Sequence, residues 1–159
     1  MGNRLIQIRP ILFALGLMVC LMALAMTLPA ALDLADGSPT WRAFAVSSLF
    51  SLFVGVLMMM FAYEQRTSRV GIREGFLLTA SCWALLSAFA ALPFLGIGLP
   101  YTDAYFETMS GLSTTGATVL VGLDDLPPSI NLWRHALCWY GGMGIIVLVV
   151  AILPLLGVG

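Results

Sequence analysis

The fold of this chain is decided by residues 102–119, which read TDAYFETMSGLSTTGATV. The first part is predicted to be a short helix, with Asp103 as its N-cap and residues 104–112 as its body. At ~1.5 Å rise per residue, this helix is roughly half as long as a bilayer is thick. The Ser-Thr-Thr-Gly run that follows is predicted to be extended, because β-branched threonines disfavour helix and Gly116 permits backbone angles that a side chain would forbid.

A short helix followed by extended backbone is suited to binding a cation at membrane depth. Carbonyls without partners are tolerated there only where they line a watery path or are buried in protein. Such carbonyls replace the water around an ion, while the helix directs its negative C-terminal end at the cation. The alternative is an ordinary extracellular loop with a helical turn. We favour an ion-binding selectivity filter, and its expected residues are Thr114, Thr115, Gly116, Ala117 and Thr118.

Within this filter, the backbone oxygens are the expected ligands, with the hydroxyl of Thr115 or Thr118 assisting. Glu107 and Ser113 are expected to support the filter from behind. We expect Glu107 to accept hydrogen bonds from the filter backbone or from a nearby hydroxyl, in preference to touching the ion directly. Ser113 is a poor nucleophile candidate, because no G-x-S-x-G elbow surrounds it. An intramembrane hydrolase is therefore disfavoured, and no enzyme activity or catalytic residue is expected.

Composition places the chain in a membrane. It is 60% hydrophobic and 9% charged, whereas soluble domains are roughly 25% charged. The seven basic residues are all arginine and are dispersed, so no nucleic acid is expected as a partner. The three cysteines form no CxxC pair and lie in apolar segments, which favours packing over metal binding or disulfides.

Uncharged intervals predict the membrane spans. Four segments are long enough to cross at ~20 residues each, namely residues 10–32, 43–63, 75–100 and 131–156. Ser47, Ser48, Ser51 and Gly55 give the second span a small-residue face that favours close packing on another helix. Trp133, Arg134 and His135 are expected to anchor the start of the fourth span at an interface. The glycines at 141, 142 and 144 match no nucleotide-binding motif and are expected to allow close packing behind the filter.

The fold class is therefore predicted as an all-α integral membrane protein. Residues 1–74 supply two leading transmembrane helices and a cytoplasmic loop, and residues 75–159 supply one helix–pore loop–helix repeat of the potassium-channel kind, with the pore loop at about 101–121. Arginine counts predict that both ends are cytoplasmic, because five arginines then lie inside and two outside. The inside set is Arg4, Arg9, Arg66, Arg69 and Arg73, and the outside set is Arg42 and Arg134.

Two runs resemble a known family of membrane proteins. FETMSGLSTTGATVL is similar to the first pore loop and filter of Trk-type potassium transporters, of the Trk/Ktr/HKT cation transporter superfamily. WRHALCWYGGMGIIVLVVAILPLLGVG is similar to the second transmembrane helix of the same repeat. The resemblance implies potassium symport into the cell across the inner (cytoplasmic) membrane, with potassium held by the backbone carbonyls of Thr114, Thr115 and Gly116. In this family, glycine at the position of Gly116 goes with a preference for potassium.

The resemblance also implies partners. The ion is substrate, no cofactor is expected, and the lipid bilayer surrounds the protein. One loop cannot enclose an ion, so three further repeats of a longer chain, or other copies of this one, are needed. A cytoplasmic nucleotide-binding regulatory subunit and a homodimer of the full-length protein are implied as well. We expect the chain to be part of a longer protein, with a small homotetrameric cation channel or a non-conducting membrane scaffold as the alternatives.

Overall fold

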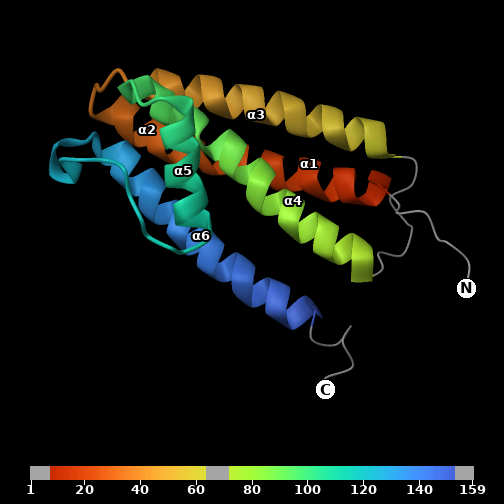
Figure 1. Cartoon of the computed structure of the whole chain (residues 1–159). Coiled ribbons are helices and arrows are strands. Elements are labelled where there is room, and N and C mark those ends of the chain that lie inside the picture. The colour runs from red at the N-terminus through yellow and green to blue at the C-terminus, as the bar shows by residue number, and fades with distance from the viewer. Residues whose placement is uncertain (1–7, 64–71, 153–159) are drawn as a thin grey trace, which may run out of the picture.

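The computed structural model describes residues 8–63 and 72–152, and all regular elements within those ranges are helical (Figure 1). The prediction of an all-α membrane protein is therefore confirmed. In chain order the elements are α1 (Ile8–Ala25), α2 (Thr27–Ala35), α3 (Trp41–Ala62), α4 (Ile72–Ala90), the 3₁₀ helix η2 (Leu92–Ile97), α5 (Tyr101–Leu112), the 3₁₀ helix η3 (Leu123–Asp125) and α6 (Pro128–Ile152).

Among the residues that the structure describes, three helical stretches are long and apolar enough to cross a membrane. They are Ile8–Ala35, Trp41–Ala62 and Arg73–Ile97, with mean hydropathies of 2.6, 2.2 and 1.8. These stretches coincide with the first three expected spans. Helix α6, with 25 residues, covers most of the fourth expected span. Residues 153–156 of that span lie outside the described residues, as do Arg4, Arg66 and Arg69, on which the predicted orientation partly depends.

The long helices lie side by side and their ends sort into two groups (Figure 1). The starts of α1 and α4 and the ends of α3 and α6 lie at one end of the molecule. Helix α2, the start of α3 and the blue-green loop around η3 lie at the other end. This alternation is what four successive crossings require.

Two of the expected spans are interrupted by proline. The first span breaks at Met26, because Pro29 has no N–H to donate to the carbonyl of Ala25 and its ring crowds that turn. The third span leaves α-helical geometry after Ala90 and continues as the 3₁₀ helix η2, which has Pro93 near its start. Gly98 then takes a left-handed conformation with φ of 80°, and the chain reverses into α5.

Helices α1 and α3 pack closely through small residues, as predicted. Ser47, Ser51 and Gly55 of α3 are buried. A Cβ added at Gly55 would lie 2.7 Å from the Cys20 sulfur and 2.9 Å from the carbonyl oxygen of Gly16. The two backbones are therefore in direct contact, and apolar side chains of these helices that point away from the pair remain free to face lipid.

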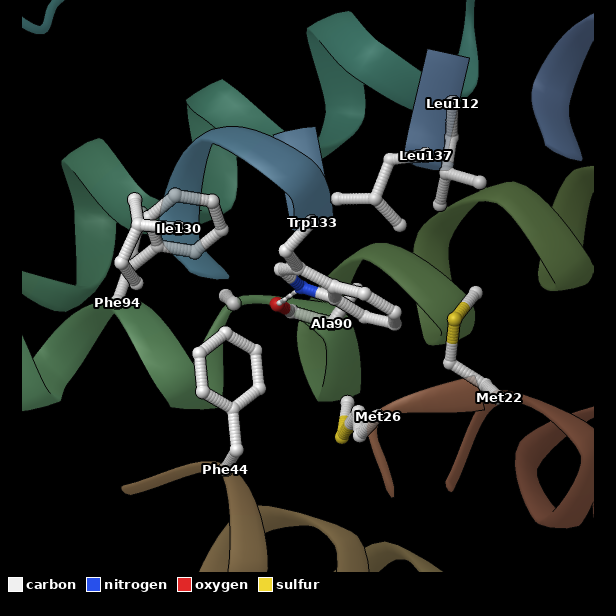
Figure 2. Packing of buried hydrophobic residues seen from close by; sticks show 11 residues of the cluster. Met22, Met26, Phe44, Ala90, Phe94, Leu112, Ile130, Trp133 and Leu137 are labelled. Carbon is white, nitrogen blue, oxygen red and sulfur yellow. Dashed lines mark hydrogen bonds between the residues drawn. The ribbon is translucent and has the colours of Figure 1, made fainter. Parts of the chain in front are cut away.

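A buried cluster around Trp133 ties the leading helices to the rest (Figure 2). The Trp133 ring meets Phe44 edge to face, with ring centroids 6.2 Å apart. Its indole N–H donates to the carbonyl oxygen of Ala90 at 3.0 Å, where α4 ends. Trp133 is fully buried, so its predicted role as an interface anchor is wrong. The signal was misleading because tryptophan at a span's end serves equally well as an interface belt or as core with its N–H paired.

Candidate functional site

Helix α5 is the short helix that leads into the expected filter. It runs from Tyr101 to Leu112 and begins after Pro100, with no side-chain cap. The predicted cap at Asp103 is therefore wrong. Asp103 lies instead in the first turn, where its charge is favourable against the helix dipole. The helix starts earlier than predicted because Pro100, in extended geometry, supplies the carbonyl that receives the Ala104 amide at 2.9 Å.

Polar side chains hold α5 against α4. The Thr108 hydroxyl donates to the carbonyl oxygen of Ser87 at 2.8 Å, and both groups are buried. One turn earlier, the Tyr105 hydroxyl donates to the carbonyl oxygen of Ala84 at 3.4 Å. Because these bonds join two helix bodies, they set how deep the end of α5 lies.

The chain turns sharply where α5 ends. Thr114 has φ of 58° and Gly116 has φ of 76°, so two of three successive residues are left-handed. The predicted need for an unusual backbone angle at Gly116 is confirmed, whereas the angle at Thr114 was not foreseen. Threonine rarely adopts such an angle, and strained residues of this kind gather at functional sites.

In this turn the amides of residues 114–116 donate hydrogen bonds to α5, and the carbonyls of the same residues take no part in these bonds. The Thr115 amide donates to the Ser110 carbonyl oxygen at 2.9 Å, and the Gly116 amide donates to the same oxygen at 3.4 Å. Within the described ranges, no hydrogen bond is made to the carbonyls of Thr114, Thr115 or Gly116. All three residues are exposed in this chain. Three consecutive carbonyls are thus free to bind a cation.

The remaining predicted filter residues are placed differently. The Ala117 carbonyl turns inward and accepts the Ser110 hydroxyl at 2.6 Å. The Thr118 hydroxyl donates to Glu107 and also accepts the Leu120 amide at 3.1 Å. The Ala117 carbonyl and the Thr118 hydroxyl are therefore engaged within the protein. The Thr115 hydroxyl instead lies 2.8 Å from that of Ser113, which also donates to the Ser110 carbonyl at 3.3 Å.

Glu107, on α5, binds both the segment after the turn, at residues 118–119, and helix α6. Its carboxylate accepts the Thr118 hydroxyl at 2.9 and 3.0 Å and the Val119 amide at 3.1 Å. The Nε–H group of Arg134 on α6 donates to the same carboxylate at 2.6 Å. Sequence reasoning placed Glu107 behind the filter but missed Arg134. The available signal was an arginine inside an apolar span, which requires a partner of opposite charge.

A hollow of about 200 Å³ lies between α5, α6 and the turn at residues 113–118, the expected filter turn. Its lining includes Glu107, Ser110, Gly116, Arg134 and His135. The His135 ring nitrogen Nδ1 lies 2.6 Å from the Asn131 carbonyl of its own helix. That nitrogen must donate to a carbonyl, so His135 is oriented by α6 and not by the filter. Within residues 8–63 and 72–152, no three His, Cys, Asp or Glu side chains gather as a metal site.

Helix α6 touches the end of α5 through glycine. A Cβ added at Gly141 would overlap the carbonyl oxygen of Leu112, the last residue of α5. One turn earlier on α6, the Cβ of Leu137 would lie 3.2 Å from a Cβ added at Gly111 of α5. The expectation that glycines of this span allow close packing behind the filter holds at Gly141. Gly144, by contrast, has no non-local atom within 3.8 Å of its added Cβ.

Comparison with known proteins gives consistent matches. A family model described as TrkH, cation transport protein, matches residues 40–159. The chain is 44% identical over 156 residues to the Trk system potassium uptake protein TrkH of Halomonas elongata, covering 96% of this chain and 32% of that protein. It is also 44% identical over 154 residues to the protein of the same name from Escherichia coli, covering 95% of this chain and 32% of that protein.

A solved structure shares the fold. The crystal structure of the potassium transporter TrkH from Vibrio parahaemolyticus superposes with a TM-score of 0.88 at 41% identity, covering 96% of this chain and 33% of that one. The chain thus spans about a third of the length of the relatives it matches. The short helix, the turn with free carbonyls and the helices around them lie within a matched region of 120 residues (40–159), and the chain belongs to the TrkH family of cation transport proteins.

Proposed function

We propose that this chain supplies one quarter of the selectivity filter of a potassium uptake transporter. The observation that carries the proposal is the row of free carbonyls at Thr114, Thr115 and Gly116 directly after the C-terminal end of α5. Carbonyl oxygens of this kind replace the hydration shell of potassium in filters built from four loops. The relatives from Halomonas and Escherichia, named as potassium uptake proteins, favour potassium as the ion.

The remaining repeats of a longer chain complete the ring in this proposal. The relatives are about three times as long as this chain, which favours one longer polypeptide over a homotetramer. Residues 1–74 then serve as leading helices and residues 75–159 as the first repeat. A non-conducting scaffold is disfavoured, because a purely structural role does not explain why the carbonyls of residues 114–116 lack hydrogen bonds within the described part of the chain or why Thr114 is left-handed.

The membrane arrangement follows from charge and shape. We place the protein in the inner membrane with both ends of this chain in the cytoplasm, because arginines are concentrated on that side. The start of α1 and the end of α6 lie at the same end of the molecule, which suits this placement (Figure 1). A nucleotide-binding regulatory subunit would meet that cytoplasmic face, and a homodimer would form between full-length chains.

Gly116→Ser, introduced into the full-length protein, tests the proposal. The ratio of potassium to sodium uptake should fall, because left-handed strain of order 1–3 kcal/mol and a new hydroxyl both act on the row of carbonyls. Gly98→Ser is the matched control. Gly98 has φ of 80° against 76° for Gly116, and an added Cβ meets no atom within 4 Å at either position. Within this chain the backbone strain is therefore similar at the two positions, and the variants differ in their location relative to the proposed filter.

The measurement is isotope or tracer uptake of both ions into cells lacking other potassium uptake, normalised to membrane protein. Gly98→Ser should keep the wild-type ratio while Gly116→Ser loses it. If both variants keep the ratio at normal protein levels, residues 114–118 do not form the filter.

A further inference from the structure

The guanidinium of Arg134 lies inside the protein next to the filter turn, where a lone positive charge would repel a cation. Its side chain is 16% exposed and that of Glu107 is 3% exposed, and their nearest atoms are 2.6 Å apart. Removing two charges from water is costly and is offset only by good geometry with further hydrogen bonds. Glu107 has those bonds, since it also accepts from Thr118 and Val119.

We infer that Arg134 is a positioning residue of the ion pathway, which neutralises Glu107 and thereby keeps the filter selective for potassium. The inference rests on the proposed function. Its physical path is short: Arg134 binds Glu107, and Glu107 binds the hydroxyl of Thr118, two residues after the free carbonyl of Gly116. A change of charge at Arg134 therefore reaches the filter through two hydrogen bonds.

Neutralising Glu107 matters because its carboxylate binds residues 118 and 119, directly after the free carbonyls. With the pair intact, the ion is bound by carbonyl dipoles and has no net side-chain charge beside it. Without the guanidinium, the other partners of Glu107 are both donors, the Thr118 hydroxyl and the Val119 amide, and they need carboxylate oxygens that accept. A buried and unpaired negative charge would remain. A stronger field at the filter favours the smaller, more strongly hydrated ion, which is sodium.

The surroundings make a clean substitution feasible. Arg134 borders the hollow of about 200 Å³ that also touches Gly116 and Ala117. A shorter side chain at position 134 therefore enlarges an existing space and crowds nothing. Arg134→Gln keeps hydrogen-bonding capacity and removes the charge, so the change isolates electrostatics.

The experiment compares four variants of the full-length transporter in cells lacking other potassium uptake. Arg134→Gln should lower the potassium-to-sodium uptake ratio about tenfold, equivalent to 1.4 kcal/mol. Arg134→Lys retains the positive charge but not the planar guanidinium, and its uptake ratio should lie between those of the wild type and Arg134→Gln. The double variant Glu107→Gln with Arg134→Gln removes both charges and should recover much of the ratio. Arg42→Gln is the control, because it removes an exposed arginine from the start of α3, far along the chain from the filter.

A role in folding alone would lower the amount of protein and leave the ratio per molecule unchanged. An unchanged ratio in Arg134→Gln, at measurable protein levels, overturns the inference. A double variant no better than Arg134→Gln also overturns it, because charge would then not be the cause. Gly116→Ser is measured in parallel. If it shifts the ratio and Arg134→Gln does not, this inference alone fails, and if neither shifts, the proposed filter fails too.

Discussion

Gly141→Ala should displace the end of α5 and thereby distort the proposed filter, and the size of the effect follows from the contact between Gly141 and α5. An added Cβ would lie 2.6 Å from the carbonyl carbon and 2.9 Å from the Cα of Leu112, and nearer still to the carbonyl oxygen. Carbon atoms in ordinary contact are ≈ 3.5–4.0 Å apart, so the backbones must separate by roughly 1 Å. Leu112 ends α5, and the left-handed Thr114 follows two residues later. The displacement therefore reaches the free carbonyls.

Two opposing energies decide the stability of this variant. Overpacking of a tight contact costs about 1–3 kcal/mol, whereas replacing glycine by alanine within a helix gains roughly 0.5–1 kcal/mol. Gly144→Ala on the same helix reports the gain alone, because its added Cβ has only a Trp83 ring atom at 3.9 Å. The difference between the two variants should therefore be about 1–3 kcal/mol, with Gly141→Ala the less stable.

The assay is thermal unfolding of the purified full-length protein in detergent at a fixed scan rate, together with the potassium-to-sodium uptake ratio. Gly141→Ala should melt below Gly144→Ala and should show a reduced ratio. If the two variants melt together and both keep the wild-type ratio, α6 does not press on the end of α5. The end of α5 and the proposed filter after it would then be held by other contacts.

Two further predictions concern the scaffold and the topology. Trp133→Phe should lower the free energy of unfolding by about 1–3 kcal/mol, because the buried Ala90 carbonyl loses the indole donor. Thermal unfolding checks this, with Trp139→Phe as the control because Trp139 is 64% exposed. Equal melting temperatures of the two variants would contradict the prediction. Single cysteines replacing Tyr63 and Asp124, both exposed, in a background without the three native cysteines, should react with impermeant reagents from opposite sides of the membrane. Labelling of both from one side would rule out the four-crossing arrangement.

The helical architecture was readable because charge is so rare in this sequence. Intervals without charge located three stretches that are long and apolar enough to span. The small-residue face of the second span was readable for the same reason, since Ser47, Ser51 and Gly55 recur at helical spacing and all are buried. Local patterns of this kind need no knowledge of what lies across the fold.

The filter turn was readable in part. A glycine after two threonines indicated a backbone that side chains resist, and Gly116 has φ of 76°. The carbonyls of Thr114, Thr115 and Gly116, which the family resemblance named as ligands, accept no hydrogen bond within the described residues, whereas the exclusion of Ala117 was not readable. Ala117 was expected to bind the ion, but its carbonyl accepts the Ser110 hydroxyl. The direction of the Ala117 carbonyl depends on a side chain seven residues earlier, and no periodicity encodes that contact.

Long-range pairs account for the other differences. Arg134 and Glu107 are 27 residues apart, and Trp133 and Ala90 are 43 residues apart. Each pair is local in the fold only after α4, α5 and α6 have packed together. Reading Trp133 and Arg134 as neighbours at an interface treated them as one unit, whereas on a helix adjacent residues point in different directions and here find different partners.

These contacts together place α6 against both α5 and the segment that carries the proposed filter. Along α6, Arg134 meets Glu107, Leu137 meets Gly111, and Gly141 meets Leu112, so contacts advance along both helices in the same order. Trp133 fixes the start of this series to the end of α4. A shift of α6 along its axis would therefore move the ion pair and the glycine contact together. The charge next to the proposed filter and the contact at the end of α5 thus both involve α6, and variants at Arg134 and Gly141 should change the same ion ratio by separate physical routes.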